Sequence, residues 1–332
     1  MRQWTIINDQ LRDLGERTYV GYSYEDIKAG KVEVLPEDYD GWFPFARLCY
    51  SIGDLAITSG IFEALKSKYP KIKIAWPSDQ YLRNFHARYP GIGFGNGIDH
   101  WNYSDKVTSI DNVHSIMDNN PHIDYYFNEG EFDHIFTDHE RAYTSLQQVG
   151  DDHIRSADEP MAEQILRRFG FNDDDIKNID STPKIYFTKE EEVEFDKIIK
   201  SHVGDNEYGC LLFAGRVEKY KGRWDTETLL FEDAERFKNK PVFYYSQFDL
   251  ENTKWEEFFP NRINFAEIGL SIRAQLYIKR KALFNLGYQA GITDASSGGD
   301  SEVISLTPYT TMHECVVRNT KCIFFDGRVK HF

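Results

Sequence analysis

Residues 45–77 read FARLCYSIGDLAITSGIFEALKSKYPKIKIAWP. The stretch opens with a short apolar run, Phe45–Tyr50, and continues through a turn at Ser51–Asp54. Apolar residues then recur at helical spacing as far as Pro70, and a second apolar segment follows at Lys71–Trp76. A strand, a turn, a helix and a strand in this order are typical of a parallel, doubly wound α/β sheet.

Further alternation of the same kind is predicted on both sides of a crossover at Thr182–Thr188. In the first half we expect a helix from Ser78 to about Arg88, a strand at Ile123–Phe127, a helix at Met161–Phe169 and a helix cap at Asn172–Asp175. In the second half we expect helices at Lys189–His202, Thr226–Phe237, around Trp255 and at Ser271–Ala282, and strands at Tyr208–Phe213, Pro241–Ser246, Arg262–Ala266, Phe284–Thr293 and Cys322–Phe325.

This pattern predicts an α/β fold of two Rossmann-like domains that face each other across a cleft. The expected units are an N-terminal extension at 1–40, a first domain at 41–182 and a second domain at 183–332. A length of 332 residues exceeds the usual size of a single core, which also favours two domains. In open α/β folds, ligands bind beside the carboxyl ends of the parallel strands, so we expect the functional site in the cleft.

Charge and composition narrow the class of partner. The net charge of −15 argues against nucleic acid and against strong attachment to anionic lipid. No stretch approaches the roughly 18 apolar residues that a membrane span needs. The four cysteines are widely spaced, as expected of reduced thiols. We therefore expect a cytoplasmic protein whose contact with a membrane, if it has one, is peripheral.

A glycine-rich loop follows the last predicted strand of the second half. Residues 291–308 read GITDASSGGDSEVISLTP, and we expect the loop to open into a short helix at Ser301–Leu306. Such a helix start offers unpaired N–H groups to an anion, and glycines let the backbone approach it closely. The candidate ligand-binding residues are Asp294, Ser296, Ser297, Gly298, Gly299 and Ser301. The alternative is that Asp300 or Ser301 only caps the helix.

Two further segments could carry chemistry at the same cleft. Asp54 follows Gly53 between a strand and a helix, where its carboxylate could accept a proton or merely cap the helix starting at Leu55. Gly53 is itself a further candidate ligand-binding residue. The loop at 215–224 holds four cations in a strongly acidic chain, namely Arg216, Lys219, Lys221 and Arg223. Such cations suit a diphosphate, although a solvated turn is the simpler alternative.

Together these segments resemble glycosyltransferase family 9, the ADP-heptose–lipopolysaccharide heptosyltransferases. The resemblance covers roughly residues 43–326 and includes the motif at Tyr50–Pro70, the loop that ends in Arg223–Trp224, and the loop at Thr293–Gly298 followed by Thr307–Pro308. It departs from the family at Gly222, where the family has a lysine, and at Asp300, near the place of a histidine. The loop at Thr293–Gly298 also has two more residues than the corresponding loop of the family.

The resemblance implies a GT-B fold and an inverting, metal-independent transfer of a sugar from a nucleotide-diphospho-sugar to a glycan or glycolipid. The resemblance implies no cofactor, because the nucleotide-diphospho-sugar is the donor substrate. Asp54 would be the general base, and Lys221 or Arg223 would neutralise the leaving diphosphate. The donor would be held by Asp294, Ser297, Gly298 and Gly299.

Two alternatives lie outside glycosyl transfer. The first is a non-catalytic protein that binds a nucleotide sugar or a glycan, and the second is a GT-B-like nucleotide-sugar epimerase. A metal site from Asp133, His134, Asp138, His139 and His153 is a weaker hypothesis, since their spacing matches no known ligand pattern.

Overall fold

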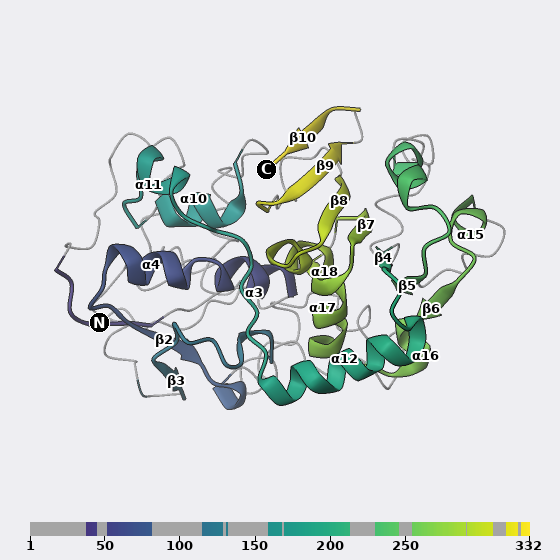
Figure 1. Ribbon diagram of the computed structural model, residues 1–332. Coiled ribbons are helices and arrows are strands. Elements are labelled where there is room, and N and C mark those ends of the chain that lie inside the picture. Colours follow the sequence, from purple (N-terminus) through teal and green to yellow (C-terminus); the bar gives the residue numbers. More distant parts are fainter. Residues whose placement is uncertain are drawn as a thin grey trace, which may run out of the picture.

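The computed structural model describes residues 38–44, 52–81, 115–128, 131, 159–167, 169–212, 230–245, 254–289, 291–307, 317–324 and 327–332. The described residues form two separate sheets, one in each half of the chain, with helices packed around them (Figure 1). The prediction of an α/β fold is therefore confirmed.

The N-terminal sheet has three described strands in the order β1-β2-β3, all parallel. These strands are β1 (Trp42–Pro44), β2 (Lys73–Pro77) and β3 (Tyr125–Phe127). The helices of this half are α3 (Ile52–Ser59), α4 (Phe62–Lys68), the 3-10 helix η2 (Ser115–Met117), α10 (Met161–Arg167) and α11 (Asp173–Lys177). The strands predicted around Lys71–Trp76 and Ile123–Phe127 are confirmed, whereas the run at 45–50 lies outside the described residues.

The single helix predicted up to Pro70 is broken in two at Gly60. At this break the crossover passes so close that a Cβ on Gly60 would lie 2.6 Å from the carbonyl oxygens of Ser181 and Thr182. The Ser59 hydroxyl also accepts a hydrogen bond of 2.9 Å from the Lys184 N–H. The crossover therefore fixes where α3 ends.

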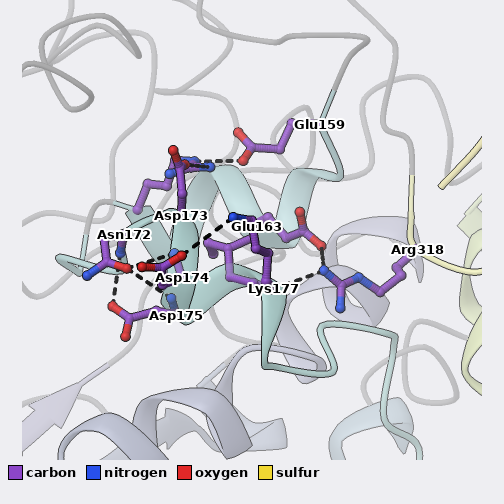
Figure 2. Close-up of polar contacts among 10 residues, drawn as sticks. Glu159, Glu163, Asn172, Asp173, Asp174, Asp175, Lys177 and Arg318 are labelled. Carbon is purple, nitrogen blue, oxygen red and sulfur yellow. Dashed lines mark hydrogen bonds and ion pairs between the residues drawn. The ribbon is translucent and has the colours of Figure 1, made fainter.

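Side-chain caps explain where the two helices that flank the crossover begin. Asn172 and Asp175 form a reciprocal capping box at the start of α11, visible in Figure 2. Thr188 and Glu191 form another at the start of α12 (Lys189–Val203). Each box satisfies N–H groups that the first turn of a helix leaves unpaired. Both predicted helix starts are confirmed.

The C-terminal sheet has seven described strands in the order β10-β9-β8-β7-β4-β5-β6. All neighbours are parallel except β10, which runs antiparallel to β9. The strands are β4 (Gly209–Leu212), β5 (Val242–Tyr245), β6 (Arg262–Asn264), β7 (Phe284–Tyr288), β8 (Glu302–Thr307), β9 (Thr320–Phe324) and β10 (Val329–His331). Without β10 this is the 3-2-1-4-5-6 strand order of a Rossmann sheet.

Short helices connect these strands. They are η3 (Glu235–Phe237), α15 (Lys254–Phe258), α16 (Phe265–Ile268), α17 (Ile272–Lys281), α18 (Gly291–Asp294) and η4 (Ala295–Gly298). The predicted helices near Trp255 and at Ser271–Ala282 are confirmed. The strand predicted at Phe284–Thr293 ends earlier, at Tyr288, because α18 begins three residues later.

The helix predicted at Ser301–Leu306 is wrong, because Ser301 precedes β8 and the residues after it belong to that strand. This strand pairs with β7 on one side and β9 on the other, and all its residues except Glu302 are buried. A six-residue amphipathic segment is too short for its period to separate helix from strand. The β-branched Val303 and Ile304 fit the interior of a parallel sheet.

One hydrophobic cluster runs through both halves. It contains Phe43 and Ile74 from the N-terminal sheet together with Cys210 and Leu212 from the C-terminal sheet. Cys210 and Cys322 are buried free thiols, as predicted. No helix among the described residues combines the length and the apolar character that a membrane crossing requires.

Candidate functional site

The centre of the C-terminal sheet is a topological switch point. Strand β4 lies between β5 and β7, so the strand order reverses between β4 and β7. The Cα of Leu212, the last residue of β4, pairs with Gly287 near the end of β7. The chain that follows Leu212 leads into the basic loop, and the chain that follows Tyr288 leads into the glycine-rich loop. Both predicted ligand loops therefore start from neighbouring strands at the place where open α/β sheets bind ligands.

The four cations of the basic loop cannot be placed further. Arg216, Lys219, Lys221 and Arg223 lie outside the described residues, and their roles stay predictions. The same holds for the acidic and histidine residues at 133–153. Among the residues that the structure describes, no cluster of three or more His, Cys, Asp or Glu could hold a metal ion.

The first turn of α3 and the start of α18 lie in direct contact, near the middle of Figure 1. A Cβ on Gly291 would lie 2.2 Å from the Gly53 nitrogen and 2.7 Å from its Cα. Only a residue without a side chain fits at Gly291 with the backbones this close. The contact brings together the two motifs that flank Asp54 and Asp294, although these are 240 residues apart in the sequence.

Asp54 occupies the third position of α3, which begins at Ile52. It therefore lies inside the first turn, and the alternative that it caps a helix starting at Leu55 is wrong. An acidic residue is favourable there because the amino-terminal end of a helix carries partial positive charge. Asp294 is the last residue of α18. The side chains of both aspartates lie outside the described part of the structure.

The serines predicted to bind the donor are buried. Ser296 and Ser297 are both 0% exposed, and the Ser296 hydroxyl donates to the Thr293 carbonyl oxygen at 2.6 Å. Ser301 is 6% exposed and accepts a 2.6 Å hydrogen bond from the Asn285 side-chain amide. Because it precedes a strand, Ser301 cannot cap a helix. These contacts give each bonded hydroxyl a structural role beside its predicted ligand role.

Gly298 and Gly299 are surrounded by backbone atoms of other segments. A Cβ on Gly298 would lie 1.8 Å from the Pro183 carbonyl oxygen, and one on Gly299 would lie 2.4 Å from the Arg280 carbonyl oxygen. Glycine at these positions is therefore explained by close packing against the crossover and the end of α17. The prediction that they admit an anion rested on a helix that is absent.

Arg280 is the residue that sequence reasoning missed. Its guanidinium donates to the carbonyl oxygens of Pro183 (3.1 Å), Ala295 (3.2 Å) and Gly298 (2.5 Å). Burial lowers the pKa of Arg280 to about 10, and the nearby Asp300 carboxylate acts in the opposite direction. The group stays protonated at neutral pH. Arg280 is the second-last residue of α17, which also contains other cations. The sequence therefore did not distinguish it as the residue that contacts the crossover and the glycine-rich loop.

Neither a scan against protein-family models nor a search of curated proteins gives a match. Among solved structures, a glycosyl transferase of family 9 from Veillonella parvula is similar, with 10% identity, a TM-score of 0.52, and coverage of 88% of this chain and 87% of that chain. The E. coli ADP-heptose lps heptosyltransferase II is also similar, with 8% identity, a TM-score of 0.46, and coverage of 86% and 93%.

At such low identity the likeness concerns architecture and leaves donor and acceptor open. It agrees with the strand order of the C-terminal sheet and with the three parallel strands of the first half. The chain therefore has the two-sheet Rossmann-like GT-B fold of the family 9 glycosyl transferase structure, as its sequence motifs predict.

Proposed function

We propose that this chain is a glycosyltransferase, which moves a sugar from a nucleotide-diphospho-sugar to a hydroxyl of a glycan or glycolipid. The observation that carries the proposal is the contact between Gly53 and Gly291. It joins the segment with the predicted base, Asp54, to the segment with the predicted donor-binding residue, Asp294. Both segments lie beside the switch point of the C-terminal sheet, where a nucleotide is expected.

The proposed reaction is a single displacement with inversion. The acceptor oxygen attacks the anomeric carbon, and the bond from that carbon to the diphosphate breaks, with its electron pair leaving on the diphosphate. The Asp54 carboxylate takes the acceptor proton as the new bond forms. A base that acts in the transition state contributes about 10²–10⁴-fold to the rate.

The leaving diphosphate needs positive charge as its oxygen departs. We assign this role to Lys221 or Arg223 in the basic loop, which follows β4. Charge-assisted hydrogen bonds from lysine or arginine stabilise phosphate oxygens strongly in a site sheltered from water. On this proposal the reaction proceeds without a divalent metal.

The first test is a thermal-shift screen of nucleoside diphosphates and nucleotide sugars, with and without EDTA. A ligand that binds only the folded chain raises Tm by mass action, so one nucleotide series should give a shift that EDTA leaves unchanged. The Asp294→Ala variant should lose that shift. The absence of a shift with every nucleotide would refute the proposal.

The second test separates a transferase from a protein that only binds its ligand. With the best donor and a panel of glycan acceptors, Asp54→Asn should lower kcat by about 10²-fold or more, since it removes a base and keeps the size of the side chain. Donor affinity should stay unchanged. Donor turnover without an acceptor would instead favour an epimerase, and unaltered kcat in Asp54→Asn would exclude this residue as the base.

A further inference from the structure

The carboxyl-terminal end of α17 lies at a junction of three segments. The Arg280 guanidinium reaches the crossover through Pro183 and the glycine-rich loop through Ala295 and Gly298. The Arg280 carbonyl oxygen also accepts a 3.0 Å hydrogen bond from the Asp300 N–H. The loop is therefore held to Arg280 from both sides.

The loop fits this arginine closely. A Cβ on Gly298 would lie 2.8 Å from Arg280 Nη1, and one on Gly299 would lie 2.6 Å from Arg280 Cβ. Ala295 is fully buried in the same region. The two glycines thus let the loop pack closely around the arginine side chain, and the carbonyl acceptors of Ala295 and Gly298 fix the path of the loop.

The crossover carries the arrangement on to α3. Next to Pro183, the Lys184 N–H donates to the Ser59 hydroxyl at the end of α3. That helix begins with the Gly53 and Asp54 segment and touches α18 at Gly291. Arg280 therefore connects the glycine-rich loop, through the crossover, to the helix that carries the predicted base.

From this geometry we propose that Arg280 is a positioning residue for donor binding. It holds the loop at 291–299 in the conformation that accepts the nucleotide sugar, and it acts through the loop. The inference rests on the proposed glycosyltransferase function, and it assigns a role to a residue outside the sequence motifs.

Arg318 offers a matched control. Its guanidinium donates to the carbonyl oxygens of Ile176 (3.1 Å) in α11 and of Ile179 just after it, and it pairs with the Glu163 carboxylate of α10 at 2.5 Å. Figure 2 shows the contact with Glu163. Like Arg280, it joins the C-terminal half to a segment of the first half, but none of these partners belongs to the 291–299 loop. A variant of Arg318 therefore weakens a contact between the halves without releasing the loop.

The experiment compares Arg280→Lys with Arg318→Lys in the full chain. Lysine keeps the charge but cannot reach three carbonyl oxygens with one fork of donors. We measure Tm, hydrogen exchange over 291–299 without ligand, and the Kd of the nucleoside diphosphate that stabilises the wild type. Once an acceptor that the wild type glycosylates has been identified, the KM for the donor and kcat are also measured for each variant.

Arg280→Lys is expected to raise the donor Kd and KM about tenfold or more, since hydrogen bonds to charged groups are among the stronger ones. The kcat at saturating donor should change less than KM, and exchange over 291–299 should accelerate. Arg318→Lys should lower Tm to a similar degree, with donor Kd within about twofold of the wild type.

Two outcomes would overturn the inference. One is unchanged exchange over 291–299 in Arg280→Lys, and the other is an equal rise of donor Kd in both variants, which indicates general loosening. If no nucleotide binds the wild type, the proposed function fails, and the ligand role of Arg280 fails with it. Accelerated exchange in Arg280→Lys alone would then show that the arginine orders the loop without serving a donor.

Discussion

At the scale of single residues, Asp118 lies in an unfavourable electrostatic environment. It follows η2, and the groups that face it are Asp79 after β2, Glu191 on α12 and Arg273 on α17. Burial is the main cause that raises its pKa to about 6, and Asp79 adds to this. Arg273 lowers the pKa of Asp118, but by less than burial and the neighbouring carboxylates raise it.

Asp118→Asn is therefore expected to stabilise the protein at neutral pH. Above about pH 6 the carboxylate is charged in both the folded and the unfolded chain, so the full penalty is present. As the pH falls through 6 towards 3.8, the folded chain takes up the proton first and the penalty disappears. For this half-exposed group we expect a gain of about 1 kcal/mol at pH 7.5 that vanishes near pH 4.

Urea unfolding of both proteins between pH 4 and pH 8 measures this difference. Asp180→Asn is a control of opposite sign. Burial raises the pKa of Asp180, but hydrogen bonds from Lys184 and Thr182 outweigh this effect and lower it below its usual value. That variant should destabilise at neutral pH and recover as the pH falls. A destabilising, pH-independent effect of Asp118→Asn would contradict the electrostatic explanation.

At the scale of elements, hydrophobic periodicity and helix caps in the sequence predicted most of the described strands and helices, but they did not predict β8. Residues 301–306 form a short amphipathic segment that follows Gly298 and Gly299, which fits a helix start as well as a buried strand. What decides is the pairing with β7 and β9 on both sides, which is a tertiary property. The break at Gly60 has the same origin, since the crossover that causes it lies more than 100 residues away.

Two serines at the same strand allow a prediction about buried hydroxyls. The Ser305 hydroxyl, 1% exposed in β8, has no hydrogen-bond partner among the residues that the structure describes, whereas the Ser301 hydroxyl accepts a hydrogen bond from Asn285. Ser305→Ala removes an unsatisfied buried group and should leave stability equal or raise it by about 1 kcal/mol. Ser301→Ala takes away one of the two acceptors of the buried Asn285 amide, the other being the Lys279 carbonyl oxygen, and should cost about 1 kcal/mol.

Urea midpoints with unchanged m-values test this pair of variants. Both substitutions remove one oxygen from a buried serine, so volume effects are nearly matched. Similar losses in both would mean that the Ser305 hydroxyl gains a partner in solution.

At the scale of the whole molecule, the sequence predicted that the two ligand loops lie at one edge of the C-terminal sheet. It did not predict that the glycine-rich loop contacts the first half of the chain. Strand order and the switch point follow from alternating strands and helices. The contact of Gly53 with Gly291 requires the relative position of two sheets, and no local pattern encodes it. Arg273 belongs to the same class, since its contacts lie on η2, the crossover and α12.

Arg273 leads to the last prediction, which concerns cooperativity. Only 8% of its side chain is exposed, and it pairs with Glu191 at 2.5 Å while donating to the carbonyl oxygens of Ser115 (2.5 Å) and Tyr186 (2.7 Å). Together with the hydrophobic cluster shared by both sheets, the contact of Arg273 with Ser115 couples the halves. We expect one calorimetric transition, with the van't Hoff enthalpy close to the calorimetric enthalpy.

Glu191→Gln leaves the buried guanidinium without its carboxylate, which costs about 3 kcal/mol and lowers Tm by several degrees. The transition should remain single, because the shared hydrophobic cluster is intact. Glu192→Gln is the control on the same helix, since its partner Lys189 is largely exposed and its loss should leave Tm nearly unchanged. Two resolved transitions in the wild type would mean that the halves unfold independently, and equal effects of both variants would mean that the Arg273–Glu191 pair stabilises the protein no more than the exposed Lys189–Glu192 pair does.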